Sequence, residues 1–440
     1  MQSNDRPSPL APGSGLVDLD RATLAVLGRE WMLHAHLQDR VGIPLAMGLG
    51  GPEMMQEVSI EEWMAASPVY TRRIRRAMGI TGDDVEAIFK ALQFDIGFPH
   101  QFLDVRYHLE DPQRGTFQLA SCGALMDIEP LGEELVHTMC HTIEDPTFDA
   151  TGTASNPRAR VRPLHRPPRV PADRSPHCAW TVALEGDSDL PAHPNERIVA
   201  SSLAATVSFP APRSHPRAEP GGWDDYTHAF DPDFELEDLS HTALQTALAE
   251  FAMAGHLLAH GFLLSIEQRF GHEAAHTMAL RLFTGLGALT SQRLSRALRT
   301  GTGADGIARL LRIHPILSPA GYVDTKIEVI DGQRLRFALL DCPATREADG
   351  RTWFTALGNS PGGTNAFTAL VQGADPHAHA TPAPTGPGEH LAFDILADPT
   401  APAAPEPSEL SLAKLSTGAR FQLRTRRPVR TPIRREDQNV

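Results

Sequence analysis

The stretch that decides the fold is Pro99–Cys122 (PHQFLDVRYHLEDPQRGTFQLASC). A second copy later in the chain, Pro319–Cys342, aligns with it without a gap. Eight residues are identical at a constant offset of 220 positions. Chance would give roughly one or two identities. The identical pairs are Pro99 and Pro319, Asp104 and Asp324, Asp111 and Asp331, Gln113 and Gln333, Arg114 and Arg334, Phe117 and Phe337, Leu119 and Leu339, and Cys122 and Cys342. The chain is therefore predicted to be an internal duplication.

Each copy predicts a β-hairpin. Two runs of alternating apolar residues flank residues 111–114 (Asp-Pro-Gln-Arg) in the first copy and 331–334 (Asp-Gly-Gln-Arg) in the second, and both compositions favour a turn. Such a turn puts the following residues of the first copy on one face: Leu103, Val105, Tyr107, Leu109, Thr116, Gln118, Ala120 and Cys122. Each hairpin then ends in a cysteine on an apolar, core-facing surface.

The composition is that of an ordinary soluble globular protein. The chain has 440 residues, enough for two or three domains, with 41% hydrophobic and 21% charged residues. Its net charge of −14 argues against nucleic acid as the main partner. No membrane span is expected, because the best apolar run, residues 251–266, is too short and contains His256 and His260.

The expected location is the cytoplasm. The N-terminus has no basic start followed by an apolar core, so it does not predict a signal peptide. Four cysteines in a chain of this size do not suggest a disulfide framework, which favours a reducing compartment.

The rest of the chain divides around the two hairpins. Helical spacing at 18–41, 60–78 and 83–92 precedes the first hairpin, and long apolar helices at 239–270 and 272–297 precede the second. Alternating strands at 177–184 and 389–396 close the two halves. The predicted organisation is a disordered tail (1–16), an N-terminal module with the candidate site (17–208), a linker (209–225), a homologous C-terminal module (226–398) and a Pro/Ala-rich and Arg-rich tail (399–440). The expected fold is α+β, with helices packed on an antiparallel sheet in each module.

Cysteine and histidine concentrate in the first module. The residues are Cys122, His137, Cys140, His141, His177 and Cys178. Thiolate and imidazole are the ligands that zinc and iron prefer, and a catalytic site needs about three of them. If residues 130–144 are helical, Glu134, His137, His141 and Glu144 share one face. The alternative is a set of hydrogen-bonded histidines beside buried cysteines.

A second candidate is His272-Glu273-Ala274-Ala275-His276. On a helix this pattern places two imidazoles on one face beside a glutamate that can act as a general base, as in zinc peptidases. Gly271 interrupts the helix that the motif needs, and no glutamate between Glu273 and Glu328 supplies a third ligand. A packed or solvent-facing helix is the alternative interpretation.

Two further groups of polar residues have simpler explanations. The histidines at 34, 36, 256 and 260 lie on apolar helices and are expected to be core residues, although they could line a pocket between helices and sheet. Arg158, Arg160 and Arg162 alternate along a short extended run and, with Arg166 and Arg169, lie in a Pro-rich segment that is expected to be a solvated loop. They could instead clamp a carboxylate or phosphate.

The order of parts resembles the L-2-amino-thiazoline-4-carboxylic acid hydrolase family. The features are the hairpin that ends in Cys122, the following Asp127, and the later strand His177-Cys178-Ala179-Trp180. The resemblance covers residues 85–185 and, more faintly, 305–396. It implies hydrolysis of a C–N bond in a small heterocyclic or amidine-like substrate, with Cys122 and Cys178 at the site. The spacing from Cys122 to Asp127 and the extra segment 137–141 depart from that family's pattern, so the substrate is left open.

The leading hypothesis is a small-molecule hydrolase that acts on a C–N bond. Cys122 would be the nucleophile or a metal ligand, His141 a base or ligand, and Cys178 a further ligand of zinc or iron. The less favoured ligands are His137, Cys140 and His177, with His272 and His276 as an alternative pair. The rival hypotheses are a non-catalytic sensor that binds a ligand or metal in the same pocket, and a zinc peptidase. The expected partner is a small-molecule substrate; the residues do not indicate the metal or the oligomeric state.

Overall fold

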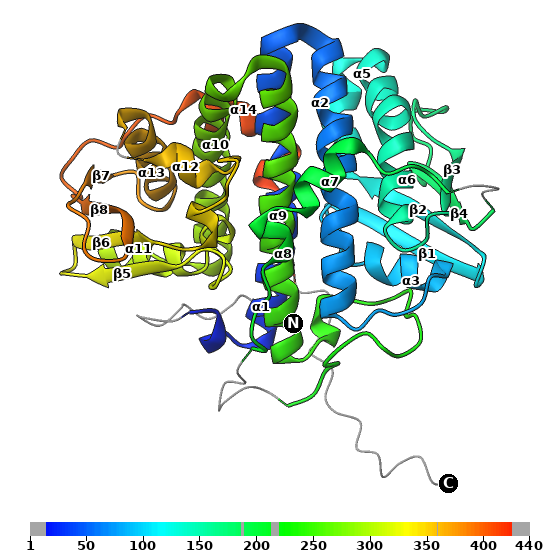
Figure 1. The fold of residues 1–440 in the computed structure, drawn as a ribbon, viewed down its shortest axis with the longest axis horizontal. Coiled ribbons are helices and arrows are strands. Elements are labelled where there is room, and N and C mark those ends of the chain that lie inside the picture. The colour runs from blue at the N-terminus through cyan, green and yellow to red at the C-terminus, as the bar shows by residue number, and fades with distance from the viewer. Residues whose placement is uncertain (1–14, 186–188, 213–219, 359, 425–440) are drawn as a thin grey trace.

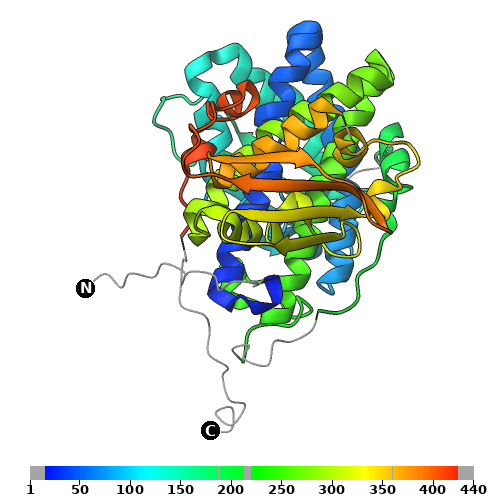
Figure 2. The same ribbon diagram turned by 90° about the vertical axis from the view of Figure 1, so that its left-hand side faces the viewer.

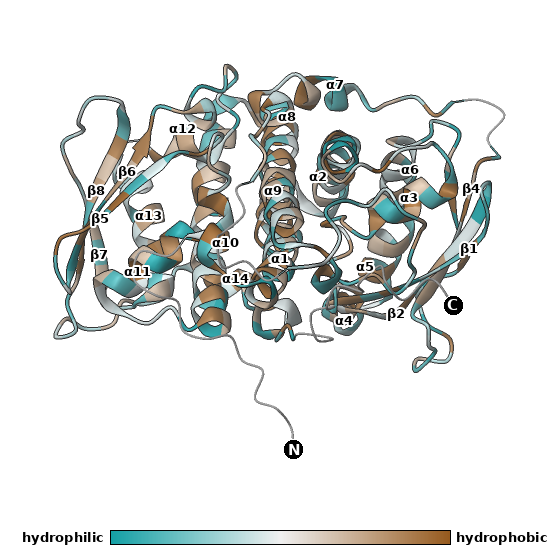
Figure 3. Cartoon of the chain, turned by 90° about the horizontal axis from the view of Figure 1, so that it is seen from below, coloured by the Kyte–Doolittle hydropathy of each residue, from teal (hydrophilic) through white to brown (hydrophobic). Residues whose placement is uncertain are grey.

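Two four-stranded antiparallel sheets lie at the two ends of the molecule's long axis, with the helices between them (Figures 1 and 3). The computed structural model describes residues 15–185, 189–212, 220–358 and 360–424. Most of the predicted N-terminal tail and the arginine-rich end after residue 424 lie outside these ranges. The α+β class, with helices packed on each sheet, is confirmed.

The first half begins with helices and ends with a sheet. Its elements are α1 (Arg21–His36), α2 (Asp39–Ala77), α3 (Val85–Leu92), β1 (Leu103–Asp111), β2 (Arg114–Cys122), α4 (Gly123–Ile128), α5 (Glu133–His137), the π-helix η3 (Thr138–Ile143), α6 (Glu144–Thr153), β3 (Arg160–His165) and β4 (Cys178–Ala183). Side-chain caps start two of the helices: Asp20 accepts a hydrogen bond from the Thr23 backbone N–H, and Asp84 accepts one from that of Ala87.

Two short helices, α7 (Pro194–Ala200) and α8 (Leu203–Thr206), lead to the second half. Its elements are α9 (His241–Phe270), α10 (His272–Leu298), α11 (Gly303–Arg312), β5 (Thr325–Val329), β6 (Arg334–Leu340), α12 (Trp353–Leu357), α13 (Pro361–Ala374), β7 (Ala378–Pro382), β8 (Glu389–Ala397) and α14 (Ser408–Ala413). Figure 2 shows the second sheet lying flat over the helices.

The two sheets have the same strand order. The first is β1-β2-β4-β3 and the second is β5-β6-β8-β7, so each consists of a hairpin joined through its second strand to the last strand of its half. Both predicted hairpins and both predicted closing strands are confirmed. A common origin of the halves stays a prediction, supported by the shared strand order.

The predicted faces of the hairpins are wrong: in each second strand, the residues that share a face with the first strand are displaced by one position. Tyr107 pairs with Phe117, and Ile327 pairs with Phe337, so the buried stripe of each second strand runs through the phenylalanine. Register shifts at Asp104/Val105 and Leu109/Asp111 add residues that period-two alternation cannot anticipate. The shift beside Asp104 also returns Cys122 to the buried face, opposite Leu103.

Corresponding aromatic residues hold a helix against each sheet. In the first half, Phe148 of α6 lies 4.8 Å from the ring of Trp180, which is itself stacked 6.4 Å from Phe117. In the second half, Phe367 of α13 lies 4.5 Å from Phe393 and 4.7 Å from Phe337. Aromatic pairs at these separations add stabilisation beyond the area that they bury.

Helix α9 forms the centre of the molecule, against α1, α2 and α10. A Cβ atom on Gly261 would lie 2.8 Å from the Glu62 backbone oxygen, so α9 and α2 approach closely here. By length and composition α9 could cross a membrane, which the sequence prediction for residues 251–266 missed. However, 94% of its most apolar window is buried inside the molecule, as in the core helix of a globular protein.

Three further expectations need correction. The helix predicted at 18–41 ends at His36, and α2 starts at Asp39 rather than near residue 60, with an interruption at Gly51 (φ 81°). Residues 160–165 form the edge strand β3 and not a loop. Within the predicted C-terminal tail, α14 packs against α10 and α2.

Candidate active site

A cavity of about 730 Å³, open solvent at its mouth included, lies between α1/α2, the first hairpin and the η3–α6 helix. Its polar lining comes from His36, Asp39, Arg40, Asp95, Tyr70, Cys122, Glu144, Thr147 and Thr151. Its apolar lining comes from Trp63, Phe98, Leu103, Leu119, Met139, Ile143 and Phe148, with Gly97 and Ala124. A largely apolar pocket with convergent ionisable groups is the usual form of a small-molecule site.

Cys122 reaches this cavity from the junction of β2 and α4. Its backbone N–H donates to Nδ1 of His177 (3.1 Å), and its Sγ accepts from the backbone N–H of Leu125 (3.3 Å), so it caps α4. Burial, and next the charge of Glu144, raise the pKa of the thiol to about 12. Cys122 is therefore a neutral thiol at neutral pH and needs a base to act as a nucleophile.

Glu144 is the ionisable group of the cavity whose pKa best suits it to accept the proton of the Cys122 thiol. It is the first residue of α6, and burial raises its pKa to about 8, against the opposing effect of Arg166. Burial and the charge of Glu144 also raise the pKa values of the Cys140 and Cys178 thiols. The charge of one carboxyl, which exchanges its proton near neutral pH, thus influences all three cysteines of the first half.

A pair of buried carboxyls forms the opposite side of the site. Asp39 lines the cavity and accepts a hydrogen bond from Nε1 of Trp63 (3.1 Å). Burial raises the pKa of Asp39 to about 6. Burial, and next the charge of Asp39, raise that of Glu62 well above its usual range. This pair therefore retains a proton at neutral pH.

His36 and Arg40 flank the carboxyl pair. Neither ring nitrogen of His36 has a hydrogen-bond partner among the described residues, and burial lowers the pKa of this imidazole well below its usual value. Arg40 donates from Nε to Asp127 (3.1 Å), while its buried Nη2 has no partner within the same described ranges. Buried polar groups without partners are costly, which is a reason to expect a polar ligand here.

Asp95 completes the group of acids. Its carboxylate accepts from the Tyr70 hydroxyl (2.9 Å) and from the Gly97 backbone N–H (2.7 Å). Burial nevertheless raises the pKa of Asp95 to about 6. Ionisable groups with shifted pKa values in one cavity are typical of functional sites.

The predicted ligand set is only partly brought together. Cys178 pairs with Leu119 of β2, the strand that ends at Cys122. Nδ1 of His177 accepts a hydrogen bond from the Cys122 backbone N–H. His141 instead stacks on His137 with 4.1 Å between ring centroids, and its Nε2 is bonded to the Pro167 carbonyl (2.7 Å). In the described parts of the chain, no group of three or more His, Cys, Asp or Glu side chains is placed to hold a metal ion.

The His-Glu-x-x-His segment lies at a helix end. Gly271 (φ 83°) separates α9 from α10, as its sequence position suggested, and His272 is the first residue of α10 with 68% of its side chain exposed. His272 faces Glu267 (3.4 Å), and Glu267 also pairs with Arg351. Glu267, the acidic side chain that His272 faces, is thus already paired with Arg351.

The histidines and arginines singled out in the sequence mostly have structural partners. His256 bonds to the Ser318 carbonyl (2.8 Å), and Nε2 of His260 lies 3.1 Å from a carboxylate oxygen of Asp349. The arginines pair with carboxylates of the same chain: Arg162 with Asp149, Arg166 with Asp145 and Arg169 with Glu129. Arg162, Arg166 and Arg169 are therefore engaged in ion pairs within the chain, and His36 is the predicted core histidine that lines the candidate site.

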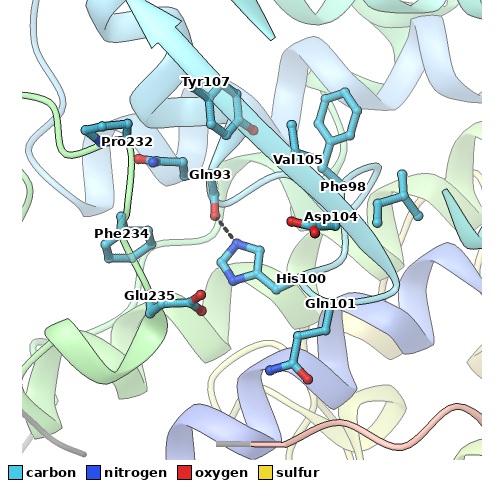
Figure 4. Close-up of a pocket in the computed structure, with 11 residues that line it drawn as sticks. Gln93, Phe98, His100, Gln101, Asp104, Val105, Tyr107, Pro232, Phe234 and Glu235 are labelled. Carbon is cyan, nitrogen blue, oxygen red and sulfur yellow. Dashed lines mark hydrogen bonds between the residues drawn. The ribbon is translucent and has the colours of Figure 1, made fainter. Parts of the chain in front are cut away.

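A second cavity, of about 400 Å³, lies beside β1 and the segment before α9 (Figure 4). It shares Phe98 and Leu103 with the first cavity. Its polar groups are Gln93, His100, Gln101, Asp104 and Glu235. The Nε2 atom of His100 is bonded to the Gln93 carbonyl (2.7 Å). It contains no cysteine, so the first cavity is the better candidate for thiol chemistry.

The sequence interpretation missed Asp39, Arg40, Glu62 and Asp95. An acidic residue on the core-facing side of a helix could have indicated them. Such a residue is rare unless it is paired, so its presence suggests a functional site. Asp39 and Glu62 belong to the same long helix, but the predicted start near residue 60 left Asp39 outside it.

Comparison of the chain with protein-family models, with curated proteins and with solved structures finds no match.

Proposed function

We propose that this chain is a small-molecule hydrolase that acts on a C–N bond in the cavity containing Cys122 and Glu144. The observation that supports the proposal most directly is a buried thiol and a carboxyl with a pKa of about 8 in one cavity. A base of this kind is ionised in the pH range where many hydrolases work. The size and largely apolar lining of the cavity suit a small heterocyclic or amidine-like substrate.

The proposed reaction begins with proton transfer. Ionised Glu144 accepts the thiol proton as the Cys122 sulfur attacks the electrophilic carbon of the substrate. The C–N bond then breaks while the proton that Glu144 took from the thiol passes to the departing nitrogen, which leaves Glu144 ionised again. Water, deprotonated by the same carboxylate, attacks the acyl or amidine carbon on sulfur and releases Cys122 as a thiol. Glu144 replaces His141 as the proposed base, because His141 is bonded to Pro167 outside the cavity.

The rival proposal is a sensor that binds a ligand in the same cavity without turnover. It is favoured by the neutral state of the Cys122 thiol, which by itself is a poor nucleophile. Zinc or iron stays a prediction from the sequence and enters neither scheme.

The two proposals differ in the fate of a probe. We use L-2-amino-thiazoline-4-carboxylate, the compound named by the family that the sequence resembles, and follow its loss by chromatography and its binding by calorimetry. A hydrolase consumes the probe in proportion to enzyme and time. Binding without loss would favour the sensor. Neither binding nor loss, repeated with an amidine that lacks the carboxylate, would contradict both proposals.

The pH dependence of turnover should identify the base. Because burial raises the pKa of Glu144 to about 8 and the reaction needs its ionised form, kcat/KM is expected to rise with pH and to level off above about pH 8. The Glu144→Gln variant should lose this inflection and about a hundredfold of the rate. An inflection near pH 6 that survives in Glu144→Gln would instead assign the base to Asp39 or Asp95.

The zinc-peptidase alternative predicts that activity depends on Glu273 and not on Glu144. Glu273 is exposed at the start of α10, outside the Cys122 cavity. Replacing Glu273 by Gln should therefore leave turnover of the probe within a few fold of wild type. Loss of the general base of a metalloprotease costs at least about a hundredfold, so a loss of that size with the fold intact would move the active site to the second half.

A further inference from the structure

The cavity that contains Cys122 combines aromatic side chains with carboxylates. Its aromatic lining consists of Trp63, Tyr70, Phe98 and Phe148. Trp63 lies between two of the acids: its Nε1 donates to Asp39 (3.1 Å), and a Cβ atom on Gly97 would lie 3.4 Å from the other end of its ring. The N–H of Gly97 in turn donates to Asp95 (2.7 Å). Cations are attracted to aromatic faces and form charge-assisted hydrogen bonds with carboxylates, so this lining suits an organic cation.

Neutral groups of the chain supply the hydrogen bonds to these two carboxyls. Asp95 accepts from the Tyr70 hydroxyl (2.9 Å) and from Gly97, both at Oδ1, which leaves Oδ2 without a donor among the described residues. Arg40 follows Asp39 in the sequence, but its Nε is already paired with Asp127 (3.1 Å). Burial raises the pKa of both acids only to about 6, so both are mostly ionised at pH 7 and give the cavity an excess of negative charge.

Unsatisfied hydrogen-bond acceptors lie beside the acids. His36 lines the cavity and is only 7% exposed, and neither of its ring nitrogens has a partner in the described parts of the chain. Oδ1 of Asp39 is also buried without a partner there. A neutral imidazole has one acceptor nitrogen, so these atoms and Oδ2 of Asp95 offer three acceptors, against the unpaired donor Nη2 of Arg40. The site therefore requires a group with several N–H donors.

We propose that the cavity binds an amidinium cation and that Asp39 and Asp95 are the residues that select it. A planar amidinium group can lie against the Trp63 ring while its N–H groups donate to the two carboxylates and to His36. A quaternary ammonium ion has the charge without the donors, and a neutral amide lacks the charge. The inference rests on the proposed function for the location of the substrate, and it adds the charge of the substrate and the residues that recognise it.

Calorimetric titration of the full chain at pH 7 with benzamidine and benzamide tests the charge preference. Benzamidine is a cation, and benzamide is a neutral molecule of nearly the same shape. Benzamidine should bind at least about tenfold more tightly, because charge-assisted hydrogen bonds are roughly twice as strong as neutral ones. Tetramethylammonium, which has no N–H donor, should bind at least about tenfold more weakly than benzamidine.

Two substitutions identify the acids that bind the cation. Asp39→Asn and Asp95→Asn should each weaken benzamidine binding by about tenfold and leave benzamide binding within about twofold of wild type. Glu53→Gln makes the same charge change at an exposed position of α2 and should leave both affinities unchanged. Circular dichroism shows whether each variant is folded.

The pH dependence of binding tests the proposal in the unmodified chain. The charged and titratable groups that face the two acids are His36, Arg40, Glu62, Tyr70, Cys122 and Glu144. Because a cation favours the ionised carboxylates, whose pKa is about 6, benzamidine affinity should rise about tenfold from pH 5 to pH 7 for each proton released. Glu144 has a pKa of about 8 and ionises mainly above this range. Benzamide affinity should not change.

The outcomes separate this inference from the proposed hydrolase activity. Equal affinities for benzamidine and benzamide, no binding of either, or benzamidine binding that is independent of pH would overturn the inference. Unchanged binding in both aspartate variants, or tetramethylammonium binding as tight as that of benzamidine, would also overturn it. Selective benzamidine binding without any turnover of L-2-amino-thiazoline-4-carboxylate would contradict the hydrolase alone. Turnover without a preference for the cation would contradict this inference alone.

Discussion

Replacing Cys122 by alanine is expected to lower turnover of L-2-amino-thiazoline-4-carboxylate by about a thousandfold or more, because removal of a nucleophile abolishes the covalent route. The same replacement at Cys342 should leave turnover within a few fold of wild type. Cys122 ends β2, Cys342 lies two residues after the end of β6, and both are buried. Only Cys122 lines the cavity that contains Glu144.

The comparison of the two cysteines also separates catalysis from folding. Each alanine removes one buried sulfur atom, so both variants should lose a similar amount of stability, measured by urea unfolding. Binding of the probe to Cys122→Ala should persist, since the carboxyls and Arg40 remain. If Cys122→Ala turns over as fast as Cys342→Ala, the thiol is not the nucleophile, and Glu144 would have to activate water directly.

The hairpins illustrate which parts of the fold local sequence can predict. Turn compositions at 111–114 and 331–334 are local signals, and both turns form where expected. The pairing register is not local in the same sense. A single extra residue between Leu109 and Asp111 reverses which side chains of β2 share a face with β1, and alternation alone contains no signal for it.

The helical spacing predicted from Glu134 to Glu144 meets a related limit. Residues 138–143 form a π-helix, so the spacing of three, four and three residues from Glu134 to Glu144 does not keep one face as in an α-helix. Glu144 lines the cavity, while His141 is bonded to the Pro167 carbonyl outside it. Cys122 could be singled out from the sequence because it ends the repeated stretch.

The acids of the cavity could not be recognised from sequence spacing. Asp39 and Glu62 are far apart in the chain, and their shifted pKa values result from burial where α2 packs against α9 and α6. Their proximity depends on the break in α2 at Gly51, because an unbroken helix would place residues 39 and 62 about 35 Å apart, whereas Trp63 reaches Asp39 in a hydrogen bond.

Replacing Arg29 by methionine is expected to reduce the free energy of unfolding by about 3 to 5 kcal/mol, because it leaves a buried carboxylate without its partner. Arg29 of α1 is fully buried and donates from Nη1 to Oε1 of Glu237 (2.8 Å), whose side chain is also fully buried. It also pairs with Glu235 (3.0 Å). These bonds join the first helix to the segment that leads into the second half. Urea unfolding, followed by circular dichroism, measures the change.

Two further variants show that the loss comes from the unpaired charge. Arg114→Met removes an exposed arginine that pairs with Glu185, and it should cost at most about 1 kcal/mol. Adding Glu237→Gln to Arg29→Met removes the orphaned charge and should restore part of the lost stability. A loss near that of Arg114→Met, or no recovery in the double variant, would contradict this account. In that case the packing of α1 against α9, and not the ion pair, would hold the two halves together.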